Sequence, residues 1–213
     1  MELSINYSLM KRIVLLLVFC AFHICMSAQR NRLGVTAGLL LSQPEDVNLH
    51  VGYSLGVTGE FLLSDKMSGF YLSPSLLFVE KGWRQDVYDL DDNKYDGRCD
   101  AYYLEVPVMA GYKWHINGDV RLFVEAGAYV ACGLFGNYKL DYEDDEFDDK
   151  NIFSSNAYRR FDWGVKAAVG VDVAKWKFAV GYGRSLQKPT KDNWNIYNLK
   201  DRSFSLSVSY MIN

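Results

Sequence analysis

The chain has 213 residues, with 26 acidic and 23 basic side chains and a formal net charge of −3. That length suits one domain, and the slight acidity provides no electrostatic footprint for binding nucleic acid. Only two cysteines, Cys99 and Cys132, follow the first 28 residues, which is too few for a disulfide framework. No later apolar stretch reaches the length of about 20 residues that a transmembrane helix needs.

The N-terminal segment has the features of an export signal. Lys11 and Arg12 precede the apolar run 13–25, and small residues follow it. A basic start, a short apolar core and small residues at the cleavage site are typical of a secretory signal peptide. We predict a cleaved signal peptide at 1–28, with Met10 as an alternative start. The mature domain is then 29–213, with a formal net charge of −4.

Alternation of apolar and polar residues marks the strands of the mature chain. In the last one, apolar residues at the even positions of 204–212 alternate with serines at the odd positions of 203–209. This two-residue period over about ten residues indicates a β-strand that is long enough to cross a membrane. Eight segments qualify: 33–42, 51–63, 69–83, 101–115, 120–136, 159–173, 175–187 and 202–212.

The connections between these segments alternate in length. Outer-membrane barrels have an even strand number, short periplasmic turns and longer external loops. The sequence therefore predicts an all-β fold, an eight-stranded antiparallel up-and-down transmembrane β-barrel in a bacterial outer membrane, with both termini in the periplasm. The short turns are 64–68, 115–119 and 174, and the long polar segments are 43–50, 84–100, 137–158 and 188–201.

Aromatic residues fall toward both ends of the outward face. Rings at the two interfaces are typical of membrane barrels. We place Phe61, Phe70, Tyr112, Trp114, Trp176 and Tyr210 near the periplasmic ends, and Tyr53, Phe78, Trp83, Tyr102, Phe161, Trp163 and Phe204 near the outer ends.

The inward face carries acids and bases in equal number. Charges removed from water are costly unless paired, and eight strands leave an interior that side chains can fill. We therefore predict a structural charge network and a plugged barrel rather than an ion-selective channel. Its members are Glu60, Lys81, Glu105, Lys113, Arg121, Glu125, Asp162, Lys166, Asp172 and Lys177.

Glycine and proline within the strands predict local features. Glycine recurs inside them, which suggests tight curvature and crowded interior packing. Pro74 and Pro107 cannot donate a ladder hydrogen bond, so we expect a β-bulge near each.

Four segments resemble the PorT-type outer-membrane β-barrel family. Tyr103-Leu104-Glu105-Val106-Pro107-Val108 is similar to its "YLEIPL" segment, and 73–82 to the preceding "PELLYSQKG" strand. The segments 161–171 and 205–210 resemble its "FDFG…GAG" and "LSLGY" strands. The chain departs from the pattern at Ala128, where the family usually has proline, and at Ile212-Asn213, which lacks the terminal Phe.

The resemblance implies a fold and a location. Its namesake is implicated in a secretion system for surface proteins, whereas most relatives look like barrels without an assigned activity. No functional residue is carried over, because a structural role suffices for Glu105 and Pro107.

Three possible sites carry weaker signals. The acidic loop 141–149 could hold Ca²⁺, although such runs are more often solvated surface. The segment 89–93 fails as a calcium loop because Lys94 stands where glycine is required. Cys99 and Cys132 could form a disulfide in an oxidising compartment, or Cys132 could face lipid.

We predict a non-enzymatic structural or scaffold protein of the outer membrane, with no catalytic, cofactor or metal site. Expected partners are outer-membrane lipids, the barrel assembly machinery and proteins of the envelope or a secretion system, and not nucleic acid. The alternatives are an outer-leaflet lipid A-modifying hydrolase that uses His50, with Asp46 and Ser185 as candidate partners, and a small passive pore. We interpret His50 as a surface loop residue, and we place His115, the other mature histidine, at a periplasmic turn.

Overall fold

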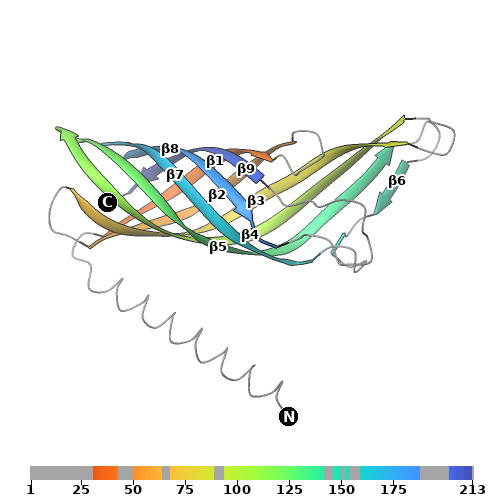
Figure 1. The fold of residues 1–213 in the computed structure, drawn as a ribbon, viewed down its shortest axis with the longest axis horizontal. Helices are drawn as coiled ribbons and strands as arrows, with labels where there is room; N and C mark the ends of the chain where they lie inside the picture. The colour runs from red at the N-terminus through yellow and green to blue at the C-terminus, as the bar shows by residue number, and fades with distance from the viewer. Residues whose placement is uncertain are drawn as a thin grey trace, which may run out of the picture.

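The computed structural model describes residues 31–42, 50–63, 68–88, 94–141, 146–149, 152–153, 159–187 and 202–212. These residues form a closed antiparallel β-barrel from which long strands extend at one end (Figure 1). Within these ranges, no helix has both the length and the hydropathy to span a membrane.

Eight strands close the barrel. Each pairs with the next one along the chain, and β1 pairs with β9, so every barrel strand has two partners. Closure is what hydrocarbon demands, since an open edge would leave backbone N–H and C=O groups without partners. The strands are β1 (Asn31–Ser42), β2 (His50–Leu62), β3 (Gly69–Tyr88), β4 (Lys94–Asn117), β5 (Val120–Asp141), β7 (Phe161–Val173), β8 (Trp176–Ser185) and β9 (Arg202–Met211), while the short β6 (Glu146–Asp149) pairs with β5 beyond the barrel.

The eight-stranded prediction is confirmed, but two predicted loops are partly wrong. Most of the segment 84–100 belongs to the β3–β4 hairpin, in the part next to its connecting loop. The segment 137–158 includes the end of β5 and all of β6. Hydrophobic alternation stops near residue 83 because a hairpin outside a membrane can be polar on both faces. The backbone ladder continues there without that signal.

The predicted bulges at the two prolines are also wrong. The β2–β3 ladder omits the pairs opposite Ser73 and Pro74, and the β3–β4 ladder omits those opposite Val106 and Pro107. On both sides of each gap the register is unchanged. A missing N–H therefore removes ladder bonds here without inserting a residue. The shifts that occur lie between β4 and β5, at Tyr102/Tyr103 and His115/Asn117.

The outer wall is apolar. Val165, Val169 and Leu206 are 46%, 57% and 56% exposed, and they alternate with side chains that point inward. A soluble monomer rarely exposes a continuous apolar surface of this extent. The wall is therefore suited to acyl chains.

Aromatic rings cluster at both ends of this wall. Beside the β2–β3 turn, the Tyr112 ring contacts Phe70 edge to face and Trp114 at a tilt, with centroids 4.9 Å apart in each pair. At the other end, Tyr102 packs between Phe78 and Phe135 at 5.7 and 4.7 Å. Of the predicted girdle, the Trp83 side chain lies outside the described residues.

Interior rings lie against glycines of neighbouring strands, which agrees with the expected crowding. A Cβ on Gly111 would stand 2.6 Å from the Tyr71 ring, and one on Gly164 would stand 2.6 Å from the Tyr129 ring. Any larger residue at these positions would displace the ring or the strand.

Three of the turns lie at the same end of the barrel as the start of its first strand and the end of its last strand. Gly34 near the start of β1 pairs with Met211 at the end of β9, on the side of the β2–β3, β4–β5 and β7–β8 turns. The last two turns each contain a left-handed residue, Gly118 with φ 54° and Ala174 with φ 53°. We call this side the turn end and the opposite side the outer end.

Candidate functional site

An ion-pair cluster fills the barrel near the turn end. Lys113 is completely buried, and its Nζ lies 2.6 Å from Glu60 Oε2 and also contacts Asp172. Arg32 Nη1 lies 3.5 Å from Glu60 and 3.3 Å from Asp172, and Arg121 Nε lies 3.7 Å from Asp172. We call these five residues the inner charge cluster. It ties five strands together across the lumen, namely β1, β2, β4, β5 and β7.

Two aromatic rings, a third acid and a second lysine extend this cluster. The Tyr71 hydroxyl donates to Glu125 Oε2 at 2.7 Å, and Lys177 Nζ donates to the same oxygen at 2.8 Å. The ammonium of Lys113 lies 4.8 Å from the centre of the Tyr71 ring, and that of Lys177 lies 4.3 Å from the Phe123 ring. These cation–π contacts help to stabilise charges that are buried within the barrel.

A second cluster lies farther toward the outer end. Lys166 donates to Glu105, whose side chain is fully buried. Lys81 Nζ is 3.4 Å from Glu105 and 3.4 Å from Asp162, and the Tyr129 hydroxyl donates to Asp162 at 3.0 Å. We call these five residues the outer charge cluster.

All ten residues of the predicted interior network thus lie within the lumen, in two groups rather than one. Sequence reasoning missed Arg32, although it shares the parity of the inward residues of β1 and stands opposite Glu60 in the ladder. It also missed Tyr71 and Tyr129 as hydroxyl donors, since parity shows which way a ring points but not what its hydroxyl reaches.

A small cavity remains within the barrel. Its volume is about 120 Å³, which leaves room for several water molecules. Glu125, Lys166 and Lys177 border it, and half of its other lining residues carry hydroxyls, including Thr36, Thr58, Ser73, Ser205, Ser207 and Ser209.

Two loop residues close the barrel at its outer end. Ile152 and Phe153 are 2% and 5% exposed, and the Phe153 ring meets Tyr103 edge to face at 5.7 Å. The Ile152 N–H donates to the Gly136 carbonyl at 3.1 Å, which fixes the segment against β5. This part of the predicted polar loop is therefore buried, and Phe153 stacks over Gly133, where no side chain competes for the space.

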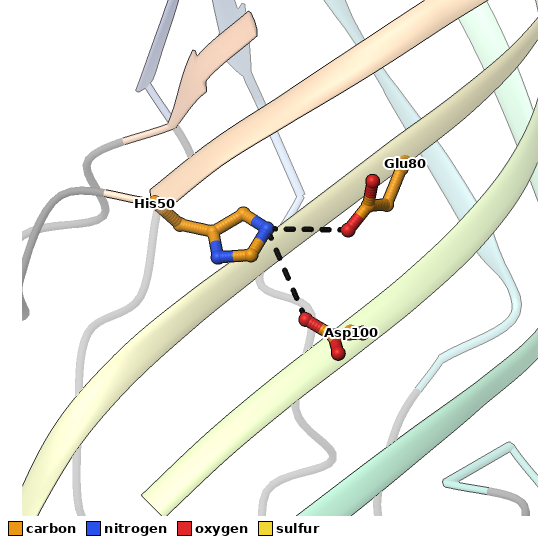
Figure 2. A group of neighbouring side chains, drawn as sticks. All are labelled: His50, Glu80 and Asp100. Carbon is orange, nitrogen blue, oxygen red and sulfur yellow. Dashed lines mark ion pairs between the residues drawn. The ribbon is translucent and has the colours of Figure 1, made fainter.

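A further group of titratable residues lies at the outer end. His50 Nε2 is 3.4 Å from Glu80 Oε1 and 3.9 Å from Asp100 Oδ1, and the three residues come from β2, β3 and β4 (Figure 2). His50 is 3% exposed, so the interpretation of it as a surface loop residue is wrong. It begins β2 and pairs with Ser42, which the sequence had placed at the end of the preceding strand.

Gly82 makes room for this histidine. A Cβ at that position would stand 2.8 Å from His50 Nε2. Gly82 pairs with Asp100, and Glu80 is two residues away on the same face of β3. On the exposed side, Arg98 Nε hydrogen-bonds to Asp100 at 3.0 Å, which raises the pKa of Arg98.

The remaining sequence hypotheses have mixed outcomes. Both thiols are free: Cys99 is buried and Cys132 is exposed on the outer wall. Ser185 donates to Asp162 at 2.5 Å. Asp46 and the segment 89–93 lie outside the described residues, as do the side chains of 141–149.

Residues 28–189 match the family described as "Outer membrane protein beta-barrel domain". The chain belongs to this family. It is accordingly a bacterial outer-membrane β-barrel, as the loop pattern and the apolar wall also indicate. No curated protein matches the sequence.

Three solved structures are similar in part. Ail of Yersinia pestis is 14% identical, with 85% of this chain and 97% of Ail covered and a TM-score of 0.40. Neisserial surface protein A is 11% identical, with 84% and 96% covered and a TM-score of 0.44. The outer membrane enzyme PagL is 12% identical, with 83% and 98% covered and a TM-score of 0.44. These values are too low to transfer any activity to this chain.

Proposed function

We propose that this protein is a non-enzymatic scaffold: a filled barrel that holds an acidic β-sheet outside the membrane and binds envelope or secretion-system proteins through it. The observation that carries this proposal is the filled lumen. The resemblance of four segments to the PorT-type family makes a secretion-system protein the first candidate partner.

The interior argues against a passive pore. An ion that moved along the lumen would have to pass the inner charge cluster, the outer charge cluster and the Ile152–Phe153 plug. Lys113 and Glu105 lie at the centres of the two clusters with no exposed side-chain surface. Opening either would require separating paired charges in a medium that solvates them poorly.

The strands near the outer end are longer than a membrane requires. A membrane strand needs about 9–11 residues, whereas β3, β4 and β5 have 20, 24 and 22. At about 3.3 Å per residue, β4 is roughly 80 Å long, and a tilt of about 45° still leaves a rise of some 55 Å. The apolar band of such a barrel is only about 25 Å tall. A substantial sheet therefore extends beyond it.

This projecting sheet, which we call the outer platform, consists of the strand residues beyond position 82 in β3, before 101 in β4 and after 136 in β5, together with β6. By sequence, its strand residues contain seven acidic and four basic side chains, and the connecting segments 89–93 and 142–145 add six acidic side chains and no basic one. A negative field of this density favours a partner with a basic surface and accelerates its association. The first strand begins and the last strand ends on the side of the turns. Because the short turns of such barrels are periplasmic, this supports periplasmic termini and an external platform.

One observation favours the alternative, a lipid-modifying hydrolase. Ser42 stands opposite His50 in the β1–β2 ladder, and its buried Oγ has no hydrogen-bond partner. Ser42, His50 and Glu80 would then supply a serine, a histidine and a carboxylate from three adjacent strands, as a hydrolase requires. Two facts weigh against it: Ser42 is only 1% exposed, and His50 Nε2 faces carboxylates rather than a hydroxyl.

The scaffold is tested by site-specific photocrosslinking in intact cells. A photoreactive residue replaces Arg98, which has 47% of its side chain exposed at the platform, or Ile116, which is 57% exposed at the turn end. We expect one defined protein adduct from position 98 that weakens as salt is raised, and none of that mass from position 116. The same adduct from both positions would contradict a platform-specific partner.

Lipid A mass spectra of a deletion strain distinguish the hydrolase alternative from the scaffold. We expect no change in acyl composition. A change that is restored by the wild-type gene but not by Ser42→Ala would overturn the non-enzymatic assignment.

A further inference from the structure

His50 presents a buried nitrogen that lacks a hydrogen bond. Its side chain is 3% exposed, and Nε2 has no hydrogen-bond partner although two carboxylates stand within 4 Å. A buried polar atom without a partner is rare in folded proteins and calls for a specific explanation, one of which is a bound ion. The nitrogen points into the space between Glu80 and Asp100 (Figure 2).

The three donor atoms suit a divalent transition metal. One ligand atom from each residue lies within 4.8 Å of the others. Ligands about 2.1 Å from a tetrahedral zinc ion are roughly 3.4 Å apart, which is the separation between His50 Nε2 and Glu80 Oε1. Asp100 Oδ1 lies 3.9 Å from the same nitrogen and would have to move about 0.5 Å closer to reach that spacing. Imidazole nitrogen with two carboxylates is a zinc donor set, and the nitrogen disfavours calcium and magnesium.

We propose that His50, Glu80 and Asp100 form a zinc-binding site at the outer end of the barrel. Three protein ligands leave a fourth position for water or another ligand. Gly82 supplies the space, because a Cβ there would meet the imidazole. Arg98 holds the Asp100 carboxylate from the exposed side and acts as a positioning residue.

The local charge also favours a cation. Glu80 and Asp100 contribute two negative charges, of which Arg98 offsets one. The ammonium of Lys81, the residue that follows Glu80, is engaged with Glu105 and Asp162 in the outer charge cluster.

The site would join β2 to β3 in a region where the two strands are no longer paired. The described β2–β3 ladder ends at Ser54 and Val79, four residues short of His50. A metal held by β2, β3 and β4 would tie the β1–β2 hairpin to the base of the outer platform. The inference does not depend on the scaffold proposal, since it rests only on the donor atoms.

The test is zinc binding by the full mature barrel, refolded in detergent and stripped with a chelator. Equilibrium dialysis against Zn²⁺ should give about one ion per chain. His50→Gln and Glu80→Gln should each weaken binding at least tenfold, because even loss of a residue that supports a metal ligand typically costs about 10–100-fold. His115→Gln and Asp119→Asn, at the turn end, should leave affinity unchanged. Stoichiometry near zero, or affinity that survives His50→Gln in a folded barrel, would overturn the site.

A second measurement needs no variant. Zinc K-edge absorption of the loaded wild-type protein should show one imidazole nitrogen and oxygen ligands in the first coordination sphere. Sulfur in that sphere would place the ion on a cysteine and refute the proposal, as would oxygen ligands alone, which would place it on acidic side chains elsewhere.

Discussion

Replacing Lys113 with methionine tests the inner charge cluster most directly. The side chain is completely buried and contacts Glu60 and Asp172, which are also completely buried. Methionine fills a similar volume but leaves two carboxylates without their central cation. Removing one partner of a buried ion pair typically costs about 3–5 kcal/mol.

The surrounding arginines set where in that range the loss falls. Arg32 lies within 3.5 Å of both acids, and Arg121 lies 3.7 Å from Asp172. Because they continue to compensate part of the charge, we expect the lower end, about 3 kcal/mol. Reversible urea unfolding in lipid vesicles, followed by tryptophan fluorescence, measures this loss. Lys175→Met at the exposed β7–β8 turn is the matched control and should keep wild-type stability.

A rescue variant separates electrostatics from packing. Adding Glu60→Gln to Lys113→Met removes the carboxylate that has lost its closest cation and keeps Asp172 as the partner of Arg32 and Arg121. This double variant should restore part of the lost stability, since neutral replacement of both members of a buried ion pair is often harmless. If Lys113→Met is as stable as wild type, the cluster does not contribute as described. If the double variant is no better than Lys113→Met, packing rather than charge explains the loss.

Three further predictions test the wall, the plug and the glycine contacts. Val169→Arg, in the middle of the apolar wall, should lower the free energy of unfolding in lipid vesicles by about 2–4 kcal/mol, whereas Ile116→Arg near the turn end should cost no more than about 1 kcal/mol. Phe153→Ala should leave planar bilayers non-conducting, because both charge clusters remain, and a stable new channel would show that the plug alone closes the lumen. Gly164→Val should displace the Tyr129 ring and lower the urea concentration at the midpoint of unfolding. An unchanged midpoint would mean that the space between Gly164 and the ring can hold a side chain.

The barrel could be predicted from sequence because membrane and lumen impose opposite demands on alternate residues. The closing strand shows this plainly, since its apolar residues at the even positions of 204–210 face lipid while its serines face the cavity. The outer platform could not be predicted in the same way. Beyond the apolar band both faces of a strand meet water, so the two-residue signal disappears although the pairing of Trp83 with Cys99 continues the ladder.

The sites divide along a similar line. Parity alone places Lys113 and Glu105 in the lumen, since a charged residue cannot face acyl chains without a large cost. Parity cannot place His50, because this histidine lies at the edge of a predicted loop, where no alternation of apolar and polar residues shows which way it points. Its neighbours Glu80 and Asp100 come from strands that are distant in sequence, and only the fold brings them together. The same holds for Phe153, whose burial depends on the space above Gly133.

The charge-filled lumen also has a consequence for export. Buried ion pairs are weak evidence of stability, because well-packed apolar groups often serve as well. An apolar lumen would, however, make each strand apolar on both faces. The segment 120–136 has 17 residues, and Arg121 and Glu125 are its only charged ones. Replacing both with leucine would create an apolar run near the lower limit of about 17–25 residues for a transmembrane helix.

We therefore expect the Arg121→Leu/Glu125→Leu variant to remain in the inner membrane during export, which the N-terminal segment predicts. The matched control is Arg121→Gln/Glu125→Gln, which removes the same charges and contacts but keeps the segment polar. Membrane fractionation should place the control in the outer membrane at reduced stability and the leucine variant in the inner membrane. Equal distribution of the two would show that the lumen charges are kept for folding alone. Retention of only the leucine variant would show that the polar lumen is also a condition of reaching the outer membrane.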